Sequence, residues 1–112
     1  MATIANLQID QGANFATTVN LTNLDSTDFN LTGYTVASQM ARTYTSATKT
    51  TITAAINNAA TGEIALSLTN TQTSALNSGR YVYDVEITQT SGGAKTRVIE
   101  GQITVHPQVT ST

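Results

Sequence analysis

Apolar and polar residues alternate one by one along most of this chain. Successive side chains of an extended strand point to opposite faces, so this alternation is typical of β-strands that are buried on one face only. The clearest example covers residues 80–89. Its alternation predicts one face formed by Tyr81, Tyr83, Val85 and Ile87, and an opposite face formed by Val82, Asp84, Glu86 and Thr88.

Shorter stretches of the same alternation predict the remaining strands. They cover residues 7–9, 15–21, 34–40, 52–56, 64–68 and 95–105. In the third of these stretches, one face is expected to carry Tyr34, Val36, Ser38 and Met40. In the last stretch, one side is expected to carry Arg97, Ile99, Gly101, Ile103 and Val105.

Turns and one helical segment separate the predicted strands. Clusters of Asn, Asp, Ser and Gly predict turns at residues 24–30, 57–62 and 91–93, the second of them within a hairpin. The polar stretch 44–51 is expected to be a loop. Residues 69–76 lack the period of two, so Thr69 is expected to cap one short helical turn, with Leu76 pointing inward.

Together these elements predict an all-β protein, an immunoglobulin-like β-sandwich of roughly seven or eight short antiparallel strands with one short helical turn. A closed small barrel is the alternative fold. The length of 112 residues suits one domain. We expect an N-terminal arm or first strand at residues 1–10, the sandwich at 11–107, where Pro107 ends the last strand, and a flexible tail at 108–112.

Composition narrows the possible classes of function. Only 11% of the residues are charged, and Thr, Ser, Asn and Gln take the places that charged residues usually occupy. With 39% hydrophobic residues and a net charge of −2, the chain is expected to fold. Binding to nucleic acid is not expected, because the five basic residues are scattered and form no cationic run.

Membrane and cofactor binding are not expected either. No stretch approaches the roughly 20 apolar residues of a membrane helix, and the N-terminus lacks the basic and apolar regions of a signal peptide. The chain contains no Cys, which excludes disulfides and thiolate metal sites. The glycines lie at turns and form no phosphate-binding motif. No cofactor is therefore predicted.

Few residues are candidates for catalysis. The one His, His106, is expected to be exposed at a strand end, without the partner and enclosed site that a general base needs. Asp84 and Glu86 place two carboxylates on one strand face, the minimum for glycoside hydrolysis. Nothing around them indicates a cleft, so we expect a solvated face on which they pair with Arg97 across the hairpin. We predict no catalytic, cofactor-binding or metal-binding residues, and no enzymatic activity.

Two further polar motifs have ordinary structural explanations. Asp25 and Asp28, near Asn23 and Asn30, offer the oxygen ligands that calcium prefers, but their spacing does not match a calcium-binding EF-hand loop. A turn rich in Asp and Asn is expected instead. Asn20 and Asn30 each begin a glycosylation sequence, and without a secretory signal these matches are expected to be coincidental.

Four large side chains on the two longest strands have two possible roles. Tyr81 and Tyr83 would form an aromatic binding surface if they were exposed. Gly79 and the alternation after it favour core positions, or a tyrosine corner at the start of a sandwich strand. Val82 and Val98 look outward and are candidates for an interface, unless they face the second sheet.

Several stretches, in the same order over nearly the whole chain, resemble a module found in virion proteins of tailed bacteriophages, especially cyanophages. The most specific are Leu31-Thr32-Gly33-Tyr34 and Gly79-Arg80-Tyr81-Val82-Tyr83-Asp84-Val85. The others are Asp10-Gln11-Gly12 with Phe15, Leu66-Ser67-Leu68-Thr69 with Gln72-Thr73, and Arg97-Val98-Ile99-Glu100-Gly101 before Thr104-Val105. The module is also similar to the N-terminal immunoglobulin-like domain of phage baseplate upper proteins.

The resemblance implies a structural protein located in the virion, with other virion proteins as partners. Decorating or cementing the capsid surface, against the major capsid protein, is the first expectation. A neck, tail or baseplate component is the second, and a host-surface or carbohydrate-binding adhesin is the third. Symmetric shells imply a homo-oligomer or lattice-bound copies. Exposed sheet edges, with residues 1–10 and the tail after Pro107 as arms, are expected to dock by strand addition.

Overall fold

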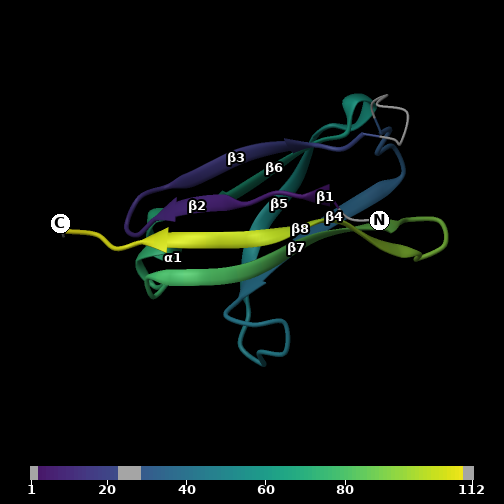
Figure 1. Ribbon diagram of the computed structural model, residues 1–112. Coiled ribbons are helices and arrows are strands. Elements are labelled where there is room, and N and C mark those ends of the chain that lie inside the picture. The colour runs from purple at the N-terminus through teal and green to yellow at the C-terminus, as the bar shows by residue number, and fades with distance from the viewer. Residues whose placement is uncertain (1–2, 23–28, 110–112) are drawn as a thin grey trace.

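The computed structural model describes residues 3–22 and 29–109, and this part of the chain is mostly β-structure (Figure 1). Its strands are β1 (Thr3–Ile4), β2 (Leu7–Asp10), β3 (Phe15–Asn20), β4 (Tyr34–Ala41), β5 (Thr50–Asn58), β6 (Glu63–Leu68), β7 (Gly79–Gln89) and β8 (Lys95–His106). A 3-10 turn, η1 (Ala59–Thr61), joins β5 to β6, and α1 (Asn70–Ser74) lies between β6 and β7. The predicted all-β, immunoglobulin-like sandwich is confirmed, with a second short helical segment added.

The strands form two packed layers (Figure 1). In the larger layer, β1 and β2 pair with β8, and the order continues through β7 and β4 to the first residues of β5. The second layer consists of the later residues of β5 with β6 and β3. The strand β5 therefore joins the two layers along one side. No described pairing connects β3 to β1 or β2, so these strands do not close the alternative barrel.

The prediction of antiparallel strands throughout is wrong for the two N-terminal strands. Both β1 and β2 run parallel to β8, with Ile4 opposite Glu100 and Ile9 opposite Val105. Alternation indicates which face of a strand is buried, but it carries no information about the direction of the neighbouring strand. Parallel neighbours need a long connection, and the rest of the sandwich between β2 and β8 provides it.

The alternating apolar residues meet between the layers in one core. All four inward residues predicted for β7 are buried, and they face a second layer in which Ile64 and Leu66 are fully buried. Burial of each large aliphatic side chain stabilises the fold by roughly 1.5–3 kcal/mol. The core residues that are almost completely shielded from solvent include Ile9, Leu31, Met40, Ile52, Ile64, Leu66, Tyr83, Val85, Ile99, Ile103 and Val105.

A β-bulge in β8 changes the face predicted for Arg97. The pairing register shifts by one residue between the Val85–Ile99 and Glu86–Arg97 pairs, so β8 contains one extra residue there. The extra residue interrupts the alternation. Arg97 is exposed and forms an ion pair with Asp84 on the outside of the sheet, whereas Ile99 is buried. The expectation that these two residues share a side is therefore wrong.

The break between β1 and β2 is held against β8 by specific hydrogen bonds. The N–H of Ala5 donates to the carbonyl of Glu100 (2.9 Å). The side-chain oxygen Oδ1 of Asn6 accepts the N–H of Gln102 (3.1 Å), which has no strand residue opposite it at this point. Main-chain groups at the break thus keep their partners, and the N-terminal segment is fixed to the larger sheet.

The connection from β6 to β7 has two recurring sandwich features. Thr69 and Gln72 form a reciprocal capping box, because Oγ1 of Thr69 accepts the N–H of Gln72 (3.3 Å) and Oε1 of Gln72 accepts the N–H of Thr69 (2.9 Å). The predicted cap and the inward position of Leu76 are both confirmed. The hydroxyl of Tyr81 donates to the carbonyl of Asn77 (3.0 Å), which is the tyrosine corner considered above.

The remaining predicted turns fall close to their expected places. The hairpin at 57–62 is formed through η1, and Gly62 takes the left-handed conformation that closes it (φ 71°). The turn at 91–93 joins β7 to β8. The predicted loop at 44–51 is two residues too long, because β5 begins at Thr50. Most of the turn predicted at 24–30 lies outside the described residues.

Candidate functional site

The larger sheet has one face turned away from the second layer, and this face gathers charged, amide and apolar side chains. It is formed by alternate residues of β4, β7 and β8, together with residues of β1 and of the loop between β4 and β5. We call this surface the outer face. Its principal residues are Ile4, Gln39, Tyr44, Lys49, Val82, Asp84, Glu86, Arg97, Glu100 and Gln102.

Two hollows on the outer face share Tyr44 as a common wall. The first, of about 200 Å³, lies between β4, β7 and the loop that carries Tyr44 and Lys49. The second, of about 270 Å³, lies over β8 beside Ile4. Both are open to solvent. Ile4 is 70% exposed and Tyr44 is 62% exposed, so two large apolar side chains are presented to solvent around the second hollow.

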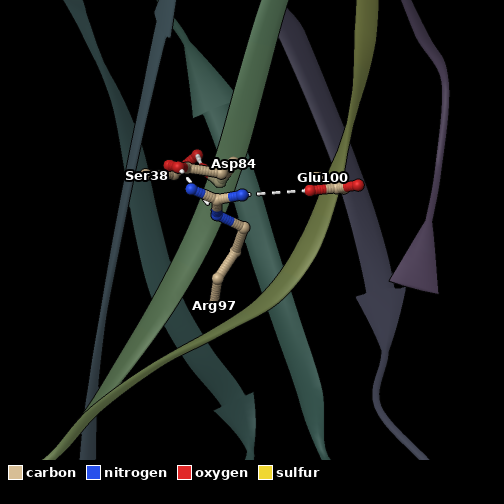
Figure 2. Close-up of polar contacts among 4 residues, drawn as sticks. All are labelled: Ser38, Asp84, Arg97 and Glu100. Atoms are coloured by element: carbon tan, nitrogen blue, oxygen red, sulfur yellow. Dashed lines mark hydrogen bonds and ion pairs between the residues drawn. The ribbon is translucent and has the colours of Figure 1, made fainter. Parts of the chain in front are cut away.

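Arg97 joins two carboxylates on this face (Figure 2). Its Nε lies 3.4 Å from Oδ2 of Asp84 on β7, and its Nη1 lies 3.1 Å from Oε2 of Glu100 on β8. Below them, the buried hydroxyl of Ser38 donates to the main-chain carbonyl of Asp84 (2.7 Å). The side chains of this bridge remain a third to a half exposed, so the ion pairs contribute little to stability but fix the arrangement of charges on the surface.

Asp84 is held in an environment that disfavours its charge. Partial burial raises the pKa of the Asp84 carboxyl above its ordinary value of 3.8, and the nearby carboxylates of Glu86 and Glu100 add to this rise. Arg97 and Lys49 act in the opposite direction without cancelling it. The fold therefore disfavours the charged form of the Asp84 carboxyl on the outer face.

Replacing Asp84 by Asn is expected to leave the protein at least as stable as the wild type at pH 7, although an ion pair is lost. A carboxyl whose folded-state pKa is raised stabilises the fold fully below its unfolded pKa, and that contribution is lost as pH rises through the folded pKa. The unfolding free energy of Asp84→Asn relative to wild type should therefore increase from about pH 3 to pH 7. Urea denaturation at a series of pH values measures this difference.

Glu100→Gln is the matched control, because it also removes one carboxylate partner of Arg97 from the same bridge. We expect it to change stability by less than about 0.5 kcal/mol at neutral pH. A loss of stability for Asp84→Asn that grows toward pH 7 would contradict the assignment of Asp84 as a disfavoured charge.

The structure brings some of the residues considered from the sequence to the outer face and leaves others elsewhere. The predicted pairing of Arg97 with the Asp84–Glu86 strand is confirmed for Asp84. Val82 lines the first hollow on the outer face, whereas Val98 packs against the core. Tyr81 and Tyr83 are core residues, which confirms the structural interpretation.

Other sequence candidates line neither hollow or lie outside the described residues. His106 is exposed at the end of β8, as expected, with Nε2 3.3 Å from Oε1 of Gln8. Oδ1 of Asn30 accepts the N–H of Thr32 (2.9 Å). Asp25 and Asp28 lie outside the described residues. Within residues 3–22 and 29–109, no three His, Asp or Glu residues form a group suited to a metal ion.

Sequence reasoning missed Ile4, Tyr44 and Glu100 as members of a common surface. Tyr44 is an aromatic residue inside a polar stretch, a signal that could have singled it out. Ile4 and Glu100 meet only because β1 runs parallel to β8, where they are paired. That pairing cannot be inferred from alternation.

Comparisons with known proteins bear on the fold. No protein-family model matches the chain, and no curated protein matches it. The crystal structure of InlP from Listeria monocytogenes aligns with 94% of this chain at 15% identity and a TM-score of 0.51, and the aligned region spans 28% of the InlP chain. The NK cell receptor NKp44, described as a triggering partner in natural cytotoxicity, aligns with 95% of this chain and 99% of its own, at 11% identity and a TM-score of 0.43.

At this level of identity, the similarity to InlP shows a shared fold and nothing about activity. In the described part of the chain, neither helical segment is long and apolar enough to cross a membrane.

Proposed function

We propose that the protein is a non-enzymatic structural component of a tailed-phage virion that decorates or cements the capsid surface through its outer face. The observation that carries this proposal is the composition of that face. Two exposed apolar side chains, Ile4 and Tyr44, lie beside the Arg97-bridged carboxylates of Asp84 and Glu100. Protein interfaces commonly combine a few apolar or aromatic anchors with a polar rim of this kind.

The shape of the hollows supports a protein partner over a small substrate. Small-molecule sites usually enclose most of the ligand in a concave pocket, whereas both hollows of the outer face are open. Each is large enough to receive one or two side chains of a partner. A cationic or amide group of the partner, placed in the first hollow, would relieve the unfavourable environment of Asp84.

The resemblance of residues 31–36 and 79–85 to phage virion modules supports the class of partner. On the capsid, that partner is the major capsid protein, and the symmetry of the shell provides many equivalent attachment points. A neck, tail or baseplate component is the second candidate, which the similarity to baseplate upper proteins favours. An adhesin is the third, because Tyr44 offers one exposed aromatic ring to a sugar, and a glycan array tests it.

The test uses phage particles assembled without this protein, to which the purified protein is added before sedimentation. Wild-type protein is expected to sediment with the particles. Tyr44→Ala and Ile4→Ala should each weaken this binding by on the order of tenfold, because each removes an apolar anchor. Both side chains are mainly exposed, so the melting temperature should stay within about 2 °C of the wild-type value.

Thr71→Ala is the control variant, since Thr71 is an exposed residue of α1 that lies outside both hollows. It should sediment with the particles as the wild type does. The proposal is overturned if wild-type protein does not bind the particles, or if the two outer-face variants bind as well as Thr71→Ala.

A further inference from the structure

The strand β3 is an edge strand without the usual protection against pairing. Among the described strands it pairs with β6 alone, and it borders the molecule in Figure 1. Its sequence, Phe-Ala-Thr-Thr-Val-Asn, contains no charge, Pro or Gly. Natural edge strands are commonly kept apart by charged side chains, Pro, bulges or very short length. The β3–β6 pairing runs through all six residues of β3 without a bulge.

The other free end of the strand order is protected. There β1 and β2 are two and four residues long, the break between them interrupts their ladder with β8, and β2 ends at Asp10. A further strand that added to this end could pair only with two short strands separated by a break. Of the two free ends, β3 is therefore the one suited to bind another strand.

The register with β6 shows which main-chain groups of β3 are free. The N–H of Leu21 donates to the carbonyl of Gly62 (2.9 Å), and this bond continues the register in which Asn20 is opposite Glu63. Hydrogen-bonding direction alternates along an antiparallel strand. The main-chain groups of Phe15, Thr17 and Val19 therefore point to β6, and those of Ala16, Thr18 and Asn20 point outward to the free edge.

The order of side chains along β3 is self-complementary. If two copies pair antiparallel about a twofold axis at Thr17, Phe15 of one copy lies opposite Val19 of the other, and Ala16 lies opposite Thr18. Residues directly opposite each other lie on the same face. In this register, the half-buried inward residues of one copy lie opposite inward residues of the other. The exposed residues of one copy likewise lie opposite exposed residues of the other. The free main-chain N–H and C=O groups of Ala16 in one copy then form hydrogen bonds with those of Thr18 in the other copy.

We propose that a second copy of this chain binds at β3, so that the smaller sheets of two copies join into one continuous sheet. The contact adds main-chain hydrogen bonds and covers Phe15, Thr17 and Val19, which the open edge leaves only half-buried. This contact lies in the second layer, whereas the outer face belongs to the larger layer. Pairing at β3 therefore leaves Ile4 and Tyr44 accessible. The pairing stands independently of the function proposed above.

Sedimentation equilibrium of the purified protein tests the pairing and its register. Wild-type protein should form a reversible dimer. Ala16→Lys/Thr18→Lys places two Lys–Lys pairs directly opposite each other across the interface and should raise the dimer dissociation constant by roughly tenfold or more. Ala16→Glu/Thr18→Lys places two Glu–Lys pairs there and should keep the constant within about threefold of wild type. Both positions are exposed, so each variant should remain folded as a monomer.

Two outcomes would overturn the proposal. One is a wild-type protein that remains monomeric at several hundred micromolar, on the order of the weakest specific associations. The other is a dimer that both double variants weaken equally, because another register or another surface would then form the contact.

Discussion

Gly101→Ala is expected to destabilise the protein by about 3 kcal/mol, a large effect for one methyl group. Gly101 lies in the middle of β8, directly opposite Tyr83 of β7. A Cβ at this position would overlap the main-chain carbonyl oxygen of Ala5, and would lie 2.8 Å from the carbonyl carbon. Backbone atoms cannot move aside as the end of a flexible side chain can, so the link between β1 and β2 would be displaced.

The displacement would also remove a partly buried hydrogen bond. The hydroxyl of Tyr83 donates to the carbonyl of Ala5 (2.6 Å). Since β8 lies between β7 and β1, the Tyr83 side chain reaches Ala5 by crossing β8 at Gly101. The absence of a side chain at Gly101 thus provides room both for Tyr83 and for the N-terminal segment.

Gly92→Ala is the matched control for this prediction. Gly92 lies in the turn between β7 and β8, its φ is not in the left-handed region, and an added Cβ would meet only Oε1 of Gln89 at 3.8 Å. We expect a change of less than about 0.5 kcal/mol. Urea unfolding measures both variants. If Gly101→Ala were as stable as Gly92→Ala, the N-terminal segment would not be packed against β8 as described.

The second large effect concerns alkaline pH. Burial raises the pKa of the Tyr83 phenol from 10.0 to about 12, because the fold favours the neutral form. The resulting stabilisation is present below pH 10 and is lost as pH rises through about 12. Wild-type protein should therefore lose on the order of 2 kcal/mol of unfolding free energy from this group over that range.

Comparison with Tyr83→Phe isolates the contribution of this phenol. At pH 7 the variant should be less stable by about 1 kcal/mol, through loss of the hydrogen bond to Ala5. Its disadvantage should shrink and then reverse as pH rises from 10 toward 12. Tyr44→Phe, which alters an exposed phenol, should follow the wild-type curve. A constant difference between Tyr83→Phe and wild type at all pH values would contradict the account.

Much of the fold follows from alternation, because burial on one face of a strand leaves a period of two in the sequence. That signal correctly assigned the buried face of β7. Capping and turn residues correctly assigned the helical cap at Thr69 and the hairpin through η1. Two features escaped the alternation signal. The bulge in β8 adds one residue, so Arg97 lies on the opposite side of the sheet from the one predicted. The parallel direction of β1 and β2 depends on contacts with a strand about 95 residues away in the sequence.

The candidate site was less accessible to sequence reasoning than the fold. The Asp84–Arg97 pair was predicted because both residues flank one hairpin. Ile4, Tyr44 and Glu100 come from three distant segments, and only the tertiary structure places them around one hollow. Exposed residues of this kind do not alter the apolar pattern, so no periodic signal marks them.

The measurement that tests the central claim most directly is the number of copies of this protein per virion, determined by quantitative mass spectrometry of purified particles against the major capsid protein. Decoration of the capsid predicts a value on the order of hundreds, because the shell lattice sets the number of attachment points. A value of roughly six to a few tens would place the protein in the neck, tail or baseplate. Its absence from purified particles would contradict a structural role in the virion.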